Sequence, residues 1–300
     1  MQAVKNYLSL IKFSHTIFAM PFAMIGFSLA AIPLFNDGGS VSHHSLPVNY
    51  ELLLKLLLVI LCMVFARSAA MAFNRYLDNH FDALNPRTAI REIPAGIISA
   101  NSALWFTIVC SLLFMACAFF INPLCFYLSP VALFVILGYS FTKRFTALCH
   151  LILGLGLSLA PIGAYLAVTA RFDLVPVMIS VAVLFWVSGF DIIYALQDED
   201  FDRANQLHSI PAAVGKVRAL RISELLHALC ALLLLGVYFK GGFGWTYLIG
   251  WLIFITLLIY QHSIVKPTDL RRVNLAFMTT NGIASVLFAA FVIADIIIGH

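Results

Sequence analysis

Residues 74–91 read NRYLDNHFDALNPRTAIR and form a polar segment within a very apolar chain. Asn74, Asp78 and Asp82 are spaced four residues apart. On a helix, residues with this spacing lie on one face, each about one turn beyond the last. The segment therefore predicts a row of oxygen-bearing side chains at the end of an apolar helix.

Residues 191–211 read DIIYALQDEDFDRANQLHSIP and repeat the spacing with Tyr194, Asp198 and Asp202. The pattern Phe-Asp-x-x-Asn occurs in both segments, at the same position relative to the aspartates. We interpret the two segments as an internal duplication with one site between its halves. A chance similarity within a long apolar chain is the alternative.

The composition indicates a membrane protein. Of the 300 residues, 62% are hydrophobic and 11% are charged, and the mean hydropathy is +0.97. A soluble domain carries about 25% charged residues. The six cysteines are scattered through apolar runs without a CxxC pair, so we expect buried free thiols rather than disulfides or a metal site.

Apolar runs long enough to span a bilayer, about 20 residues each, recur along the chain. We expect an all-α integral membrane protein, a bundle of nine transmembrane helices that forms one domain over residues 1–300. The expected helices lie near residues 13–34, 52–73, 102–121, 124–141, 148–169, 175–195, 221–239, 245–262 and 274–298. The first run exceeds the h-region of a signal peptide, about 7–15 residues, and we expect it to be a retained helix.

The basic residues test this helix count. Loops on one side would hold Lys5, Lys12, Arg75, Arg87, Arg91, Lys143, Arg144, Arg203, Lys216, Arg218, Arg221, Lys266, Arg271 and Arg272, and the opposite side Lys55, Arg171 and Lys240. The positive-inside rule then predicts a cytoplasmic N-terminus. The polar segments follow the second and the sixth expected helices, so both would face the cytoplasm. The duplicated unit would therefore cover four helices.

Acidic side chains at a membrane are costly and usually mark function. Rows of carboxylates that face one another need a cation between them, and oxygen ligands of this kind suit Mg²⁺. Mg²⁺ binds through few carboxylates and readily bridges to phosphate oxygens. The sequence therefore predicts a Mg²⁺-bridged phosphate or diphosphate at the cytoplasmic face, with solvated loop charges as the alternative.

Basic residues stand where a polyanion would need them. Lys143 and Arg144 lie in YSFTKRF, between the two polar segments, and Arg87 and Arg91 follow the first aspartates. Arginine can bind phosphate oxygens through two hydrogen bonds. The alternative is that all four are ordinary charges of cytoplasmic loops.

The chain resembles the intramembrane aromatic prenyltransferases of the UbiA type. NRYLDNHFDALNPRTAIREIPAG and DIIYALQDEDFDRANQLHSIPAAVG are similar to the two signature motifs of that family, and YSFTKRFT is similar to its intervening basic motif. The resemblance covers nearly the whole chain and implies nine helices with a cytoplasmic N-terminus. It also implies a Mg²⁺-dependent enzyme that uses a polyprenyl diphosphate.

The resemblance assigns roles to individual residues. The residues that would hold Mg²⁺ ions are Asn74, Asp78, Asp82, Asp198 and Asp202. Lys143 and Arg144 would stabilise the departing diphosphate. Asp191, which opens the second motif, would assist loss of the ring proton, either as a base or by stabilising positive charge. Arg87, Arg91 and Tyr194 would contact the substrate.

The acceptor is less strongly indicated. Residues 11–26, IKFSHTIFAMPFAMIG, resemble the first helix of a branch commonly labelled 4-hydroxybenzoate polyprenyltransferase-like. Arg67 is a candidate partner for the carboxylate of an aromatic acid, although it could instead pair with a structural carboxylate, and His15 could help position the acceptor. We expect 4-hydroxybenzoate, in ubiquinone biosynthesis, with a dihydroxynaphthoate of a menaquinone route as the alternative.

Other functions remain open on sequence alone. A small-molecule transporter would share the internal repeat and the intramembrane charges, and prenyl transfer to haem or a chlorophyll precursor would share the fold. The expected partners are a polyprenyl diphosphate, an aromatic carboxylic acid and the lipid bilayer, and no nucleic acid. The expected location is the inner (cytoplasmic) membrane.

Overall fold

The computed structural model describes residues 2–11, 18–36 and 48–299, and within these ranges every regular element is a helix. The α-helices are α1 (Gln2–Leu10), α2 (Met20–Asn36), α3 (Val48–Leu77), α4 (Asn79–Leu84), α5 (Ala100–Ile121), α6 (Pro123–Thr142), α7 (Cys149–Thr169), α8 (Leu174–Ala195), α9 (Glu199–Ala204), α10 (Ile210–Val214), α11 (Lys216–Gly241), α12 (Trp245–Ile264) and α13 (Asn281–Ile298). A short 3₁₀ turn (Leu196–Asp198) follows α8, and a π-helical turn (Leu275–Thr280) leads into α13.

Eight helices in the described part of the chain are long and apolar enough to cross a membrane. This confirms the all-α membrane architecture. The expected first helix, 13–34, overlaps α2, whose apolar part is Met20–Pro33, but residues 12–17, with His15, lie outside the described residues. The count of nine and the side of each terminus therefore stay predictions.

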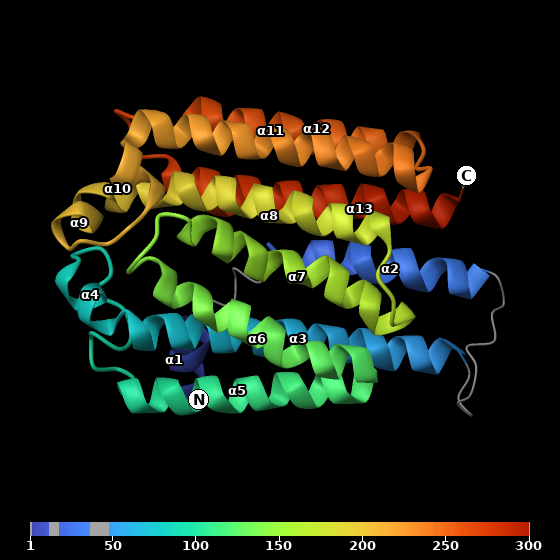
Figure 1. Ribbon diagram of the computed structural model, residues 1–300, viewed down its shortest axis with the longest axis horizontal. Helices are drawn as coiled ribbons and strands as arrows, with labels where there is room; N and C mark the ends of the chain where they lie inside the picture. Colours follow the sequence, from blue (N-terminus) through green and yellow to red (C-terminus); the bar gives the residue numbers. More distant parts are fainter. Residues whose placement is uncertain (1, 12–17, 37–47, 300) are drawn as a thin grey trace.

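The long helices run side by side along the long axis of the molecule, and the short helices α4, α9 and α10 gather at one end (Figure 1). Residues 74–91 and 191–211 lie at this end, which we call the motif end. It also receives the loop between α6 and α7. The helix order therefore brings both polar segments and the basic loop to one place.

The centre of the bundle is an aromatic cluster. Trp186 of α8, Phe22 of α2, Phe254 of α12 and Phe288 of α13 are all at most 1% exposed, and their rings contact one another at centroid distances of 5.1 to 6.4 Å. Lipid tails are as apolar as these side chains, so close packing rather than exclusion of water stabilises the cluster.

Close helix contacts depend on two glycines. A Cβ atom at Gly26 would lie 2.0 Å from the carbonyl oxygen of Pro161, and one at Gly154 would lie 2.5 Å from that of Leu184. Both positions therefore exclude any larger residue. They allow α7 to pack tightly between α2 and α8.

Helices α5 and α6 meet at a tight turn at Asn122-Pro123. The Asn122 side chain accepts a hydrogen bond from the Cys125 amide at 2.8 Å and so caps α6. It also donates to the Leu166 carbonyl at 2.8 Å, which joins this turn to the end of α7.

Two sequence predictions for α3 were wrong. The helix extends to Leu77, beyond the predicted range 52–73, and it therefore contains Arg75, which we had placed in a loop. Arg75 is 2% exposed and bonds Glu92 at 2.5 Å. The partner lies in the irregular segment before α5, so local hydropathy gave no sign of the pair.

All six cysteines are free thiols, as predicted.

Helix α1 was not predicted and packs at the motif end. Leu10 is fully buried against Ala72 and Ile93, and the rings of Tyr7 and Phe106 lie 4.9 Å apart. Figure 1 shows α1 beside α3 and α5. The N-terminal helix thus supports the segment that follows the first motif.

Candidate active site

A helix break interrupts each polar segment at the matching position. Helix α3 ends at Leu77 and Asp78 stands at the N-terminus of α4, while the 3₁₀ turn after α8 ends at Asp198, which stands at the N-terminus of α9. The predicted four-residue spacing survives the first break, because the amide of Asp78 still donates to the carbonyl of Asn74 and that of Asp82 to the carbonyl of Asp78. The matched geometry supports the proposed duplication.

The first row is joined internally and to arginines. The Asn74 amide donates to Asp78 at 3.0 Å. Asp82 accepts two hydrogen bonds from Nη1 of Arg91, at 2.8 and 2.9 Å. Arg144 lies 3.6 Å from Asp78 and donates to the carbonyl of Leu77.

Asp198 of the second row is held by residues of the first motif. Arg87 bonds both of its carboxylate oxygens, at 3.1 Å through Nε and at 2.5 Å through Nη2. Asn85 donates to the same carboxylate at 3.2 Å. The Tyr194 hydroxyl accepts from Arg87 Nη1 at 2.8 Å, so Tyr194 positions this arginine.

Asp202 is the most deeply buried carboxylate of the four. Its side chain is 0% exposed, and Lys143 Nζ lies 2.6 Å from Oδ1. Ser209 donates to Oδ2 at 2.8 Å. Lys143 therefore crosses from the loop between α6 and α7 to the second motif.

The structure brings these four carboxylates and four basic residues into one charge-balanced site at the motif end. Burial and the neighbouring Asp82 raise the pKa of Asp78 to about 6. Burial opposes the positive charge of Lys143, but the Asp202 carboxylate raises the pKa of Lys143 above its usual value. The basic side chains thus compensate carboxylates that would otherwise repel one another.

The donor set fits Mg²⁺ in its chemistry, because it consists of carboxylate oxygens and one amide oxygen on two facing segments. Within the described residues, no three His, Cys, Asp or Glu side chains stand close enough together to hold an ion as they are. Each carboxylate of the two rows instead lies within 3.6 Å of a basic side chain. A metal ion would therefore have to replace ion pairs between protein side chains.

Asp191 lies apart from these pairs and has a partner that the sequence analysis missed. Its Oδ2 is 2.7 Å from Nδ1 of His150, at the start of α7. His150 is 3% exposed. The only sequence signal was a polar residue at the start of an apolar run, and spacing cannot connect residues that far apart.

A separate cavity of about 350 Å³ lies between α3, α5, α6 and α7. Its wall is almost entirely apolar, and Arg67 is the one charged residue among the described residues that line it. Tyr139 also lines it and stands on the last turn of α6, four residues before Lys143. The cavity therefore reaches toward the motif-end site through Tyr139, a second residue that the sequence analysis missed.

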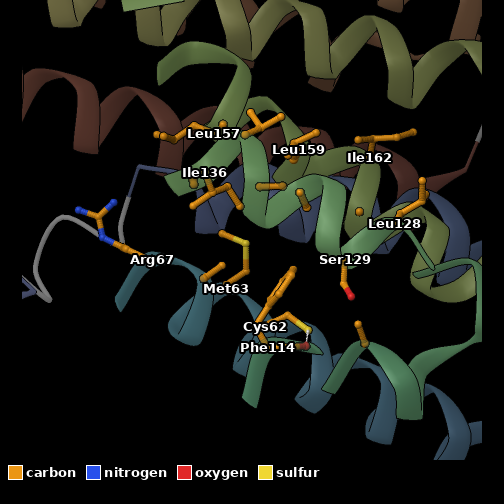
Figure 2. A pocket seen from close by; sticks show the side chains of 18 of the residues that line it. Cys62, Met63, Arg67, Phe114, Leu128, Ser129, Ile136, Leu157, Leu159 and Ile162 are labelled. Carbon is orange, nitrogen blue, oxygen red and sulfur yellow. Dashed lines mark hydrogen bonds between the residues drawn. The ribbon is translucent and has the colours of Figure 1, made fainter. Parts of the chain in front are cut away.

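Figure 2 shows Arg67 at one edge of this cavity, with Met63, Cys62 and Phe114 following along one wall. The Arg67 Nε atom is buried and has no hydrogen-bond partner in the described part of the chain. None of the ion pairs between described residues includes Arg67. No carboxylate among the described residues therefore pairs with Arg67, and its pairing with an acceptor carboxylate stays a prediction.

Comparison with known proteins agrees with this geometry. A model of the UbiA prenyltransferase family matches residues 19–285. A 4-hydroxybenzoate octaprenyltransferase of Burkholderia mallei is 31% identical over 227 residues, which is 74% of this chain and 77% of the relative. An enzyme with the same name from Aeromonas hydrophila is 30% identical over 238 residues, or 79% and 83%.

Solved structures show the same fold. The apo structure of a UbiA homolog from Aeropyrum pernix superposes with a TM-score of 0.75 at 29% identity, covering 95% of this chain and 97% of that one. A UbiA homolog from Archaeoglobus fulgidus, bound to GPP and Mg²⁺, gives 0.69 at 23% identity, covering 98% and 100%. With its membrane helices and its paired acidic motifs, the chain therefore belongs to the UbiA prenyltransferase family and is a multi-pass membrane prenyltransferase.

Proposed function

We propose that the protein transfers a polyprenyl group from a polyprenyl diphosphate to a ring carbon of 4-hydroxybenzoate, in a Mg²⁺-dependent reaction of ubiquinone biosynthesis. The observation that carries this proposal is the position of Arg67. It is a cation without a carboxylate partner among the described residues, in an apolar cavity that reaches toward the double row of carboxylates. The carboxylates would take the diphosphate, Arg67 the carboxylate of the acceptor, and the apolar wall the polyprenyl tail.

The motif-end site would take the diphosphate. The carboxylates of both rows would hold Mg²⁺, which would supply positive charge to stabilise the diphosphate as a leaving group. Arg87, Lys143 and Arg144 are already at the site and would turn to the diphosphate once metal ions take their carboxylates. The homolog structure with GPP and Mg²⁺ bound supports this assignment.

Arg67 would bind the acceptor carboxylate. An arginine can form two parallel hydrogen bonds to a carboxylate, and in an apolar wall these bonds fix the orientation of the ring. The names of the curated relatives support an aromatic acid with one ring. A neutral acceptor would leave the arginine unpaired inside the membrane, which is costly.

The cavity would take the part of the polyprenyl tail nearest the diphosphate. Its wall on α7 extends from Leu153 to Leu166, about 20 Å along the helix axis. A longer tail would leave toward the lipid past Val131 and Phe172, which line the cavity and are 59% and 57% exposed. A membrane enzyme is suited to such a donor, because the tail stays in hydrocarbon throughout.

The chemistry needs a proton acceptor near the ring. Departure of the diphosphate leaves an allylic cation, which the electron-rich ring attacks through carbon, and the apolar walls keep water away from the cation. Asp191, near the motif end of α8, would accept the ring proton. The basic residues around the site favour the cytoplasmic side of the inner membrane as its location.

The test uses isolated membranes that contain the protein, one polyprenyl diphosphate and labelled acceptors in parallel. We expect 4-hydroxybenzoate to become lipid-soluble only when Mg²⁺ is present. Labelling of a dihydroxynaphthoate instead would assign the protein to a menaquinone route. Consumption of the donor with neither acid, or transport of either acid without donor consumption, would overturn the proposal.

A further inference from the structure

His150 connects Asp191 with the second acidic motif. It stands near the start of α7, and its ring is almost fully buried. Nδ1 lies 2.7 Å from Asp191 Oδ2, and Nε2 lies 3.2 Å from the backbone nitrogen of Ile210. The ring therefore bridges a side chain at the end of α8 and the start of α10.

These two contacts fix the tautomer of the ring. A backbone N–H can only donate, so Nε2 of His150 must accept from Ile210 and carries no hydrogen. The ring hydrogen is then on Nδ1, where it points at Asp191. A hydrogen bond donated to a carboxylate favours its ionised form and holds it in one orientation.

The backbone around His150 is itself fixed. Ser188 of α8 donates to the His150 carbonyl at 3.1 Å. Ser209, the residue before Ile210, caps α10 and donates to Asp202 at 2.8 Å. The imidazole is thus anchored to the turn that also holds Asp202 of the motif-end site. Residues of α7, α8, α9 and α10 together fix the position of the ring.

Among the described residues, His150 is the one hydrogen-bond partner of the Asp191 side chain. That side chain is 22% exposed, whereas the His150 ring is enclosed. One carboxylate oxygen of Asp191 is therefore hydrogen-bonded within the protein, and part of the side chain stays accessible. An aspartate that only stabilised the fold would be expected to be enclosed on both sides.

We propose that His150 is a positioning residue that holds the Asp191 carboxylate in the orientation in which it receives the proton of the acceptor ring. The inference rests on the proposed aromatic prenyl transfer. In that reaction the bond from the allylic carbon to diphosphate breaks, with its electron pair going to the diphosphate oxygen, and a bond from the ring carbon forms. The ring C–H bond then breaks, its electrons restore the aromatic ring, and its proton moves to Asp191. His150 keeps its hydrogen throughout.

Two substitutions separate this role from a purely structural one. His150→Leu fills similar space but loses both hydrogen bonds. His150→Gln keeps one donor and one acceptor, both bonded to one carbon, so that its amide N–H could donate to Asp191 while its oxygen accepts from Ile210. The pair therefore compares the presence and absence of the same two contacts at one buried position.

The readouts are kcat for prenyl transfer, the KM of the donor, and Mg²⁺-dependent binding of a non-reactive prenyl diphosphate analogue to the purified protein. We expect kcat to fall roughly 10- to 100-fold in His150→Leu, the range seen for partners that orient a functional side chain. Donor KM and analogue binding should stay at wild-type values, and His150→Gln should recover most of kcat.

A His150→Leu enzyme with wild-type kcat would overturn the proposal. So would loss of analogue binding in both variants, because that result would mean that His150 only supports the motif-end site. A wild-type protein that prenylates no aromatic acid would instead overturn the proposed function itself. In that case analogue binding by the wild type would still report on the motif-end site alone.

Discussion

Arg87 and Asp198 belong to different motifs and are joined by two hydrogen bonds, at 3.1 and 2.5 Å. Lys143 and Asp202 form a second pair of this kind at 2.6 Å. Basic residues from the first half of the chain thus hold carboxylates of the second half. Because the same groups would bind diphosphate and Mg²⁺, binding of the two ligands requires these pairs to exchange partners.

Binding of Mg²⁺ and diphosphate should therefore be coupled. Mg²⁺ alone would leave Arg87 without its carboxylate, and diphosphate alone would leave Asp198 without its arginine, so each ligand removes a cost that opposes the other. We expect each to raise the affinity for the other by roughly 5- to 150-fold, the usual range of coupling between sites. Calorimetric titration of purified protein with Mg²⁺, with and without an unreactive prenyl diphosphate analogue, measures this. Equal Mg²⁺ affinity in both titrations would contradict it.

Asp202→Asn should abolish Mg²⁺-dependent binding of the analogue. The substitution removes the charge opposite Lys143 at a side chain that is 0% exposed, and an amide lacks the negative charge that attracts Mg²⁺. Asp200→Asn is the matched control, because Asp200 stands on the same helix but is exposed. Retained Mg²⁺ dependence in Asp202→Asn, or an equal loss in the control, would argue against this site.

Arg67→Met should raise the KM of the aromatic acid and leave the KM of the donor unchanged. Methionine keeps the apolar length of the side chain and removes the cation that would pair with the acceptor carboxylate. Hydrogen bonds to charged groups contribute about 1.5–3 kcal/mol, so we expect a rise of roughly 10- to 150-fold. Arg67→Lys keeps the charge but not the paired donors, so its acceptor KM should lie between those of the wild type and Arg67→Met. An unchanged acceptor KM would exclude this role for Arg67.

Glu92→Gln should destabilise the protein without changing the substrates it uses. Glu92 bonds Arg75 and Ser9, each at 2.5 Å, and joins α1 to the end of α3. Removing one partner of a buried ion pair costs about 3–5 kcal/mol. Thermal unfolding in detergent measures the loss, with Glu224→Gln, at an exposed position of α11, as the control. Equal unfolding temperatures in the two variants would show that the pair contributes little.

Ser129→Phe should shorten the polyprenyl chain that the enzyme prefers. Ser129 is 2% exposed and lines the cavity on α6, so a phenyl ring there would occupy space that the tail needs. Overfilling a packed interior costs about 1–3 kcal/mol, which predicts a fall of roughly 5- to 150-fold in kcat/KM for long donors. The kcat/KM for short donors should stay at the wild-type value.

Phe134→Leu serves as the control for this change, because Phe134 lies on the same helix and is 78% exposed. A Ser129→Phe enzyme with unchanged kcat/KM across donors of all lengths would mean that the tail does not enter this cavity.

Several features could be predicted from local sequence. Hydropathy located the long helices, since a span of apolar residues is a property of one segment. The four-residue spacing of Asp78 and Asp82 correctly placed them on successive turns, even though the helix breaks at Asp78. Arg67 was singled out because a charge within an apolar run is itself a local signal.

Other features depended on packing between distant segments. Arg75 was assigned to a loop because its partner, Glu92, is not recognisable from the residues around it. The bond between His150 and Asp191 requires α7 and α8 to lie side by side, and the cavity arises where four helices meet.

The sequence by itself determined the membrane fold class and the two acidic motifs, because hydropathy and residue spacing act within single segments. Only the tertiary structure decided which cation neutralises which carboxylate, which residue holds Asp191, and where Arg67 stands relative to an apolar cavity. These contacts join residues that are far apart in the chain, and the way the helices pack sets their distances.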